Sequence, residues 1–337
     1  MQPPPPTDPF PDEAGVWVLS RYRDVMAALR DPELWPVAAR DEDHAVTRDE
    51  AGRLRLRGPV MDAIAPRLDG WRARMEPVAG QLLDRLAQAE RVDLLADYAL
   101  PWCQEFALLV MQAPPEQRDR LATLSAEVFA ATGSTHDSPL RPPAAAATAE
   151  LDRLLRDGAM PMGEPTFVAI AQTTPRLLAN IWVALLEHPE EADRLRSEPG
   201  LWPGSIEELL RFAGIVHRIW RQARSPVRLE GAEIAEGQRV LLMLASANRD
   251  PAQFADPDRL DVGRRVPVQM ALGTGRNSCA GGALVRTAVE VATRALLSRF
   301  PGLRSCGETP YSIGSGYAFP TAVPVALCGG PHDEICT

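Results

Sequence analysis

The feature that most restricts the fold of this chain is a long segment with apolar residues on nearly every side. From Thr166 to Glu187 the apolar positions predict one helix, and they leave almost no polar face. A helix of this composition must be covered by other elements all around, so it belongs at the centre of a domain. The rest of the chain therefore has to supply the helices and sheets that enclose it.

Shorter amphipathic segments on both sides of the central helix predict those enclosing elements. Apolar residues recur every three or four positions from Asp62 to Gln88 and from Gly281 to Arg299. The strand-like runs are short, as at 227–231 and 238–244, and glycines separate them. We therefore expect a mainly α-helical fold with small β-sheets.

The two ends of the chain differ in composition from its middle. Residues 1–14 are rich in proline and show no periodicity, which is typical of an arm on the surface. We expect one domain over 15–327 and a short tail over 328–337. The tail contains Cys328, His332 and Cys336, which favours either a metal site with zinc-type ligands or a segment without ordered structure.

Composition excludes several classes of function. All 36 basic residues are arginine, so chemistry that requires a lysine amine, such as a Schiff base, is excluded. The net charge of -9 gives no basic footprint for nucleic acid or for an anionic membrane. No apolar run approaches the roughly 20 residues that span a bilayer. We expect a cytoplasmic protein that binds neither nucleic acid nor membrane.

The clearest indication of chemistry lies between Leu272 and Gly281. Gly273 and Gly275 allow a tight turn and the close approach of a flat ligand, and Cys279 stands just before a predicted helix. The amino end of a helix favours the thiolate form of a cysteine. Taken alone, such a cysteine is more often a small buried apolar residue, but two further motifs favour the thiolate.

This segment resembles the cysteine loop of the cytochrome P-450 superfamily, and other motifs of that family occur in the same order. The pattern Phe-Gly-x-Gly-x-(His/Arg)-x-Cys-x-Gly-x-x-Leu-Ala-Arg is matched by Gly273, Gly275, Cys279, Gly281, Leu284 and Arg286. Glu208-Leu-Leu-Arg211 resembles the Glu-x-x-Arg helix of the family, and 247–261 resembles the turn-rich segment before the loop. The resemblance extends from about Val16 to Leu327 and implies the cytochrome P-450 fold.

The resemblance implies a haem b cofactor whose iron is bound by the Cys279 thiolate. Gly273 and Gly275 are then expected against the haem. Its propionates are expected to contact a set of polar side chains, namely Arg53, Arg57, Arg221, Arg276 and Asn277. For the arginine cluster at 53–57, a solvated basic surface is the alternative.

The resemblance also implies a structural role for Glu208. In the family this glutamate pairs with the arginine three residues later, here Arg211, and with a downstream arginine that we assign to Arg259. The alternative is a capping box, in which Ser205 and Glu208 satisfy the first backbone N–H groups of their helix.

The central helix departs from the family pattern Ala-Gly-x-(Asp/Glu)-Thr-(Thr/Ser). It reads Ala169-Ile-Ala-Gln172-Thr173-Thr174, so Thr173 is the expected catalytic alcohol and Gln172 replaces an acid. A glutamine can orient water but cannot ionise to carry protons. Pro175 removes a backbone donor, which predicts a kink. The alternative for Thr173 is a hydrogen bond back to its own helix.

Two further departures concern the loop and the substrate lid. Leu272 replaces the aromatic residue that opens the loop, and the region between Pro114 and Thr166 is shorter than in the family, so we expect a shortened lid. The function implied is a haem-thiolate oxidoreductase, a monooxygenase or oxidase, that acts on a small organic substrate of secondary-metabolite type with electrons from a ferredoxin. The open alternatives are a haem protein that uses peroxide or needs no oxygen, and a non-catalytic docking module.

Overall fold

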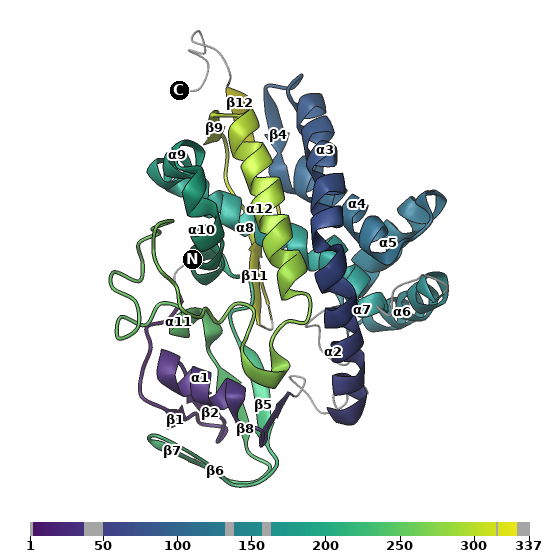
Figure 1. Cartoon of the computed structure of the whole chain (residues 1–337). Helices are drawn as coiled ribbons and strands as arrows, with labels where there is room; N and C mark the ends of the chain where they lie inside the picture. The colour runs from purple at the N-terminus through teal and green to yellow at the C-terminus, as the bar shows by residue number, and fades with distance from the viewer. Residues whose placement is uncertain (1–2, 37–49, 132–137, 157–162, 315, 329–337) are drawn as a thin grey trace. The chain divides into compact units, whose positions relative to one another are not determined.

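The computed structural model describes residues 3–36, 50–131, 138–156, 163–314 and 316–328, without the side chains of 50–56 and 328. Figure 1 labels most of its helices and strands. The chain forms two compact units. The first comprises Met1–Arg53, Pro203–Cys279 and Ile313–Ala318, and the second comprises Leu54–Trp202, Ala280–Ser312 and Phe319–Thr337. No helix of the described ranges is long and apolar enough to cross a membrane.

A five-stranded sheet is the frame of the first unit. Its strands, in spatial order, are β1 (Phe10–Pro11), β2 (Trp17–Leu19), β8 (Arg239–Leu242), β5 (Ile219–Ala223) and β3 (Leu34–Pro36). β2 and β8 are parallel, and the other neighbours are antiparallel. The remaining elements are the hairpin of β6 (Val227–Leu229) and β7 (Ala232–Ile234), helices α10 (Trp202–Ala213) and α11 (Leu244–Ala247), and the short 3-10 helix η7 (Gly275–Asn277).

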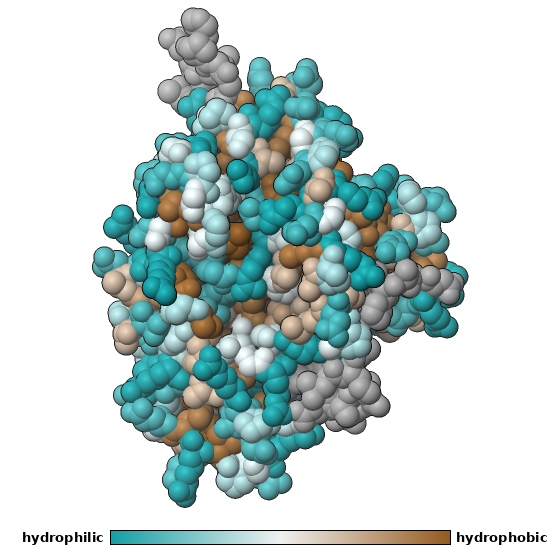
Figure 2. All heavy atoms as spheres, viewed as in Figure 1, coloured by the Kyte–Doolittle hydropathy of each residue, from teal (hydrophilic) through white to brown (hydrophobic). Residues whose placement is uncertain are grey.

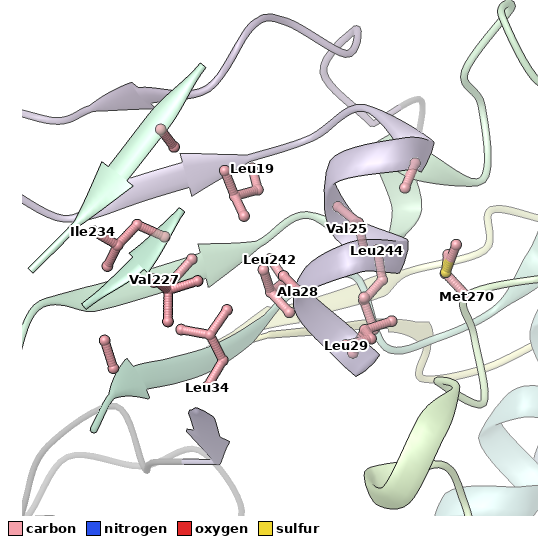
Figure 3. Close-up of a cluster of buried hydrophobic side chains, with 14 residues drawn as sticks. Leu19, Val25, Ala28, Leu29, Leu34, Val227, Ile234, Leu242, Leu244 and Met270 are labelled. Carbon is pink, nitrogen blue, oxygen red and sulfur yellow. The ribbon is translucent and has the colours of Figure 1, made fainter. Parts of the chain in front are cut away.

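Helix α1 (Tyr22–Arg30) is attached to this sheet by a buried apolar cluster. Figure 3 shows Val25 and Leu29 of α1 among Leu19 of β2 and Leu242 of β8, and none of the four is more than 1% exposed. Burial of a Val or Leu side chain contributes about 1.5 to 3 kcal/mol. The cluster therefore fixes α1, whose last turn packs against η7 in the predicted cysteine loop.

The second unit is mainly helical. Its helices are α2 (Glu50–Ile64), which belongs to this unit from Leu54 onward, α3 (Leu68–Leu86), α4 (Leu100–Met111), α5 (Arg118–Ala130), α6 (Arg141–Leu155), α7 (Glu164–Val168), α8 (Thr174–Glu187), α9 (Pro189–Ser197) and α12 (Gly282–Arg299). α3 and α12 lie side by side (Figure 1), and α5 packs on α6. An antiparallel sheet has the order β4 (Arg91–Asp93), β12 (Pro324–Cys328) and β9 (Gly302–Ser305). β10 (Tyr311–Gly314) pairs with β11 (Tyr317–Pro320), and both strands contribute residues to both units.

The central helix predicted from Thr166 to Glu187 is present, but it is not a uniform α-helix. Between α7 and α8 lies a π-helical segment, η5 (Ala169–Thr173). The N–H of Thr174 bonds to the carbonyl of Ala169, five residues back. Pro175 has no N–H to donate, so the helix tolerates the widened turn that precedes it. The distortion expected at Pro175 thus takes the form of a π-helical turn.

The predicted fold class, mainly α-helical with small sheets, is confirmed. The single domain over 15–327 and the arm over 1–14 stay predictions, although Phe10 and Pro11 of the arm pair with β2. The face of the molecule in Figure 2 is mostly hydrophilic, and apolar residues are scattered over it. This is the usual surface of a folded domain, since apolar atoms always contribute part of the exposed area.

Candidate functional site

The cysteine loop of the first unit holds its own shape through backbone hydrogen bonds. The N–H of Cys279 donates to the carbonyl of Leu272 at 2.8 Å, and the N–H of Gly273 donates to that of Met270 at 2.9 Å. Cys279 is exposed and is not in a disulfide. The loop therefore ends with a presented thiol three residues before α12 begins at Gly282.

The two glycines of the loop are required by the backbone. Gly273 has φ +65° and Gly275 has φ +71°, conformations that L side chains rarely adopt. A Cβ on Gly275 would also lie 2.9 Å from the carbonyl oxygen of Leu29 in α1. The tight turn predicted from the two glycines is therefore present. Packing against α1 accounts for Gly275 without any ligand, and the approach of a flat ligand stays a prediction.

Polar side chains near the cysteine differ in burial. Arg276 is exposed, whereas Asn277 is half-buried and its Oδ1 is a buried atom with no hydrogen-bond partner among the described residues. Buried polar atoms are normally satisfied, so this oxygen fits a loop that receives a further ligand. The pKa of the Tyr317 hydroxyl is raised by burial and by the negative charge of the Cys279 thiolate.

The arginines predicted to hold propionates occur in both units. Arg221 is buried on β5, at 6% exposure, and its Nη1 donates to the carbonyl of Trp220 at 2.8 Å. Its planar, charged guanidinium is of the kind that contacts an anionic group. Arg57 is half-buried on α2 in the second unit, and the Arg53 side chain lies outside the described residues.

A buried ionic network is centred on Glu208 and Arg211 of α10. Both side chains are fully buried, and the pair is bidentate, with Nε to Oε2 at 2.6 Å and Nη2 to Oε1 at 2.8 Å. Oε1 also accepts from Nε of Arg264 at 3.0 Å and from the N–H of Asp261 at 3.1 Å. The glutamate is thus surrounded by donors on both oxygens.

The structure corrects one member of this network. We assigned the downstream arginine to Arg259, but Arg264 makes the ion pair with Glu208. The Arg259 side chain is exposed, and the residue contributes only its carbonyl, which accepts from Arg211 and Arg264. Arg259 and Arg264 stand five residues apart in one turn-rich segment. Because this segment has no helical or strand periodicity, the sequence does not predict which of the two side chains faces Glu208.

The capping alternative for Glu208 is wrong. Helix α10 begins at Trp202, so Ser205 is the fourth residue of the helix and is not in the N-cap position. The Glu208 carboxylate is bonded to donors from α10 and from the segment around 261–264, as described above. Tertiary contacts therefore account for this residue.

In the second unit, Gln172 is buried within η5 and is held at both ends of its amide. Nε2 donates to Oγ of Ser125 on α5 at 2.9 Å, and Oε1 accepts from Nη1 of Arg176 at 3.1 Å. The Ser125 hydroxyl donates its hydrogen to the carbonyl of Ala122 at 2.9 Å. Since that hydroxyl has only one hydrogen, it must accept from Gln172, which fixes the orientation of the amide.

The two threonines of the central helix behave differently. Thr174 is the residue that bonds back to its helix, from Oγ1 to the carbonyl of Ala169 at 3.0 Å. Thr173 is half-buried, and its hydroxyl makes no hydrogen bond with any other described residue. The alternative that we considered for Thr173 therefore applies to its neighbour, and the Thr173 hydroxyl is available to a ligand or to water.

Arg176 contacts Gln172, and the sequence analysis gave this arginine no role. Its Nη1 donates to the carbonyl of Gln172 at 2.6 Å as well as to Oε1. Its guanidinium carbon lies 4.0 Å from the ring centre of Phe129 and 5.4 Å from that of Phe319. Burial lowers the pKa of Arg176 to about 10. The available signal was a charged residue in the middle of a long and mainly apolar helix.

The predicted metal cluster of the tail cannot be placed. The side chain of Cys328 and all of His332 and Cys336 lie outside the described residues. Within the ranges that the structure describes, no group of three or more His, Cys, Asp or Glu residues is arranged to hold a metal ion.

Comparison with known proteins identifies the family. Residues 201–307 match the family model for cytochrome P-450. Cytochrome P-450 107B1 of Saccharopolyspora erythraea is 30% identical over 86% of this chain and 82% of its own length. Nocardicin C N-oxygenase of Nocardia uniformis is 31% identical over 92% of this chain and 89% of its own. The LnmA cytochrome P-450 hydroxylase from the leinamycin pathway of Streptomyces atroolivaceus is 28% identical, with a TM-score of 0.80 over 92% of this chain and 90% of that structure.

The chain therefore belongs to the cytochrome P-450 family. It is a P-450-type monooxygenase, and the family carries a haem whose iron is bound by a cysteine thiolate. Enzymes of this family act on a substrate with the help of a redox partner.

Proposed function

We propose that Cys279 would supply the thiolate ligand to the iron of a haem b cofactor. The observation that carries this proposal is the exposed cysteine at the end of a loop held by the Cys279 to Leu272 hydrogen bond, directly before α12. When bound, the haem supplies the iron at which oxygen is activated, and its thiolate ligand favours O–O cleavage. The unpartnered Oδ1 of Asn277 supports the presence of a ligand at this loop.

The propionates of the haem are bound by arginine side chains in this proposal. Arg221 supports it best, because it is a buried cation on a central strand of the five-stranded sheet. Arg276 and Asn277 belong to the loop itself, and Arg53 and Arg57 of α2 complete the set. Arginine suits this role because its planar fork binds a carboxylate through two parallel hydrogen bonds.

The substrate in this proposal is a small organic molecule of secondary-metabolite type, and a ferredoxin supplies the electrons. The name of the nocardicin C N-oxygenase supports this substrate class, since that relative covers nearly the whole chain. The net reaction inserts one oxygen atom into the substrate and reduces the other to water, using two electrons and two protons. A cytoplasmic location stays a prediction.

Thr173 and Gln172 have different roles in this proposal. The Thr173 hydroxyl positions water or oxygen, because no other described residue engages it. Gln172 orients Arg176 and the π-helical turn, because its amide is bonded at both ends and cannot ionise. Protons then have to come from water or from the substrate.

The fixed amide of Gln172 favours a second candidate, turnover with peroxide. Hydrogen peroxide brings both the oxygen atom and the electrons, so a peroxide-driven reaction needs no proton relay and no ferredoxin. Rates of product formation with hydrogen peroxide and with a reduced ferredoxin separate the two routes. A peroxide-driven rate well above the ferredoxin-driven rate would select the second candidate.

The assignment of Cys279 is tested by Cys279→Ala, with Cys306→Ala as the matched control. Cys306 is half-buried and lies outside the loop, so its replacement should change nothing at the haem. The measurement is the absorption of the reduced protein with carbon monoxide, together with helix content by circular dichroism. We expect the red-shifted Soret band in the wild type and the control, and its loss in Cys279→Ala with helix content unchanged. Absence of any Soret band in the wild type would support the docking module instead.

A further inference from the structure

The guanidinium of Arg176 has most of its hydrogen-bonding capacity unused. Arginine carries five N–H donors. Only Nη1 is engaged, by the carbonyl and the Oε1 of Gln172. Nε and Nη2 make no hydrogen bond with any described residue, and no carboxylate among those residues pairs with Arg176. Nε and Nη2 form one edge of the planar group, and this edge is the part that binds a carboxylate in the bidentate manner.

The surroundings of Arg176 hold the guanidinium in place. Gln172, at 5% exposure, bonds Nη1 and is itself fixed by Ser125 of α5. The ring of Phe129 lies against the guanidinium, and the Phe319 ring is 5.7 Å from that of Phe129. An arginine whose rotamers are already restricted loses less entropy when it binds an anion. The arrangement is therefore preorganised for a ligand.

Partial burial without a counter-charge makes this cation costly for the fold alone. Desolvation lowers the pKa of Arg176 to about 10, and the side chain stays charged at neutral pH. Cation-π contacts with two rings compensate only part of that cost. An anionic ligand would supply the missing charge, and the two phenylalanine rings would contact an apolar part of the same molecule.

We propose that the substrate carries a carboxylate that Arg176 binds through Nε and Nη2, with Phe129 and Phe319 against its apolar part. The inference rests on the proposed function, because it names the substrate class of the same enzyme. It assigns Arg176 as a specificity-determining residue. Gln172 is a positioning residue that acts through Arg176.

The test is a calorimetric titration of the haem-loaded full chain with decanoate and with decanamide, which differ in charge and little in shape. We expect the wild type to bind decanoate about 10- to 100-fold more tightly. Arg176→Leu should lose this preference and keep its affinity for decanamide. Arg153→Leu is the charge-matched control, because Arg153 is 67% exposed on α6, and it should behave as wild type.

Two further variants keep the test decisive if Arg176→Leu folds poorly. Arg176→Lys retains the charge but not the fork, so it should keep only part of the preference for decanoate. Gln172→Glu places a carboxylate where Oε1 stands, 3.1 Å from Nη1, and should abolish the preference while the arginine remains. A Gln172→Glu variant that keeps the full wild-type preference for decanoate would contradict the inference.

The outcomes separate this inference from the haem proposal. The carbon monoxide spectrum reports haem ligation, and calorimetry reports anion binding without any haem signal. Equal affinities of the wild type for decanoate and decanamide would overturn the inference, as would an Arg176→Leu variant that still prefers decanoate. A wild type that lacks the red-shifted band overturns the haem proposal, whatever the titration shows.

Discussion

Two arginines of this chain, the buried Arg211 and the half-buried Arg176, have opposite surroundings. Arg211, in the first unit, uses all five N–H donors, on the Glu208 carboxylate and on the carbonyls of Asn248, Pro257 and Arg259. Arg176, in the second unit, uses one nitrogen, on Gln172. Each also lies near two phenylalanine rings. The aromatic contacts of the two arginines are alike. Their surroundings differ because Arg211 is paired with the Glu208 carboxylate, whereas no carboxylate among the described residues pairs with Arg176.

The comparison separates an arginine that completes the fold from one that is left for a ligand. A satisfied network such as that of Glu208 holds its segments in one arrangement, and removal of one member leaves the others as buried charges. A cation without a carboxylate adds little to the fold, so its removal costs little. The same residue type therefore has a structural role in one unit and a recognition role in the other.

The largest effect is expected for Arg211→Ala. The change leaves the fully buried carboxylate of Glu208 with only Arg264 and one backbone N–H, at a cost of about 3 to 5 kcal/mol. Chemical denaturation followed by circular dichroism measures this loss. A variant as stable as wild type within about 1 kcal/mol would show that the network does not hold the fold.

A second effect concerns the pH dependence of stability. It involves Glu164, an acidic residue that, like Arg176, has no ion-pair partner among the described residues. Glu164 of α7 is 8% exposed, and no arginine of the described residues forms an ion pair with it. Burial and the charge of Asp152 raise its pKa to about 7, above the unfolded value of about 4.3. The folded state therefore holds the proton more tightly, and stability is lost as pH rises from about 4.3 to about 7.

The loss amounts to at most about 4 kcal/mol, since the folded and unfolded pKa values differ by about 2.7 and each pKa unit corresponds to about 1.4 kcal/mol. Denaturation at pH 5 and at pH 8 measures it, with Glu164→Gln as the comparison. The variant cannot ionise, so its stability should fall less than that of the wild type over this interval. Equal losses in both proteins would contradict a raised pKa at Glu164.

A smaller effect is expected for Arg264→Leu, and it tests the corrected partner of Glu208. Arg264 is 13% exposed, and Glu208 keeps its bidentate bond to Arg211, so we expect a loss of about 1 to 3 kcal/mol. Arg259→Leu is the matched control and should change stability by less than about 0.5 kcal/mol, because only the backbone of Arg259 takes part. A larger loss of stability in Arg259→Leu than in Arg264→Leu would instead favour Arg259 as the partner of Glu208, as we assigned it from the sequence.

The smallest effect on stability is expected for Arg176→Leu, which should lie within about 1 kcal/mol of wild type. Loss of the hydrogen bonds from Arg176 to Gln172 destabilises the fold, whereas removal of a charge without a carboxylate partner stabilises it. The two effects on the free energy of unfolding nearly cancel. Thermal unfolding of the same preparation that is titrated with decanoate gives the value. A loss as large as that of Arg211→Ala would mean that Arg176 is structural, and the contrast between the two arginines would disappear.

Local spacing accounts for what could be predicted of the site. Glu208 and Arg211 stand three residues apart in one helix, so any helix there brings their side chains together. Cys279 precedes α12 in the chain, and its place before a helix follows from the apolar period of 281–299. The distortion at Pro175 follows from the missing N–H of proline. Each of these depends on a few neighbouring residues.

Contacts between distant segments account for what could not be predicted. Gln172 meets Ser125 across 47 positions, and Glu208 meets Arg264 across 56. The choice of Arg264 over Arg259 depends on how one turn-rich segment folds back on α10. The choice of Thr174 over Thr173 for the bond to Ala169 depends on the π-helical turn.

The sequence by itself determined the helical periods, the order of the family motifs and the chemical types available, including the absence of lysine and the amide at position 172. Only the tertiary structure decided which of these polar groups have hydrogen-bond or ion-pair partners, since the partners come from other segments that pack against them. Arg211 and Arg176 are both arginines in helices, and their different roles follow from the carbonyls and the carboxylate that the fold brings to one and not to the other.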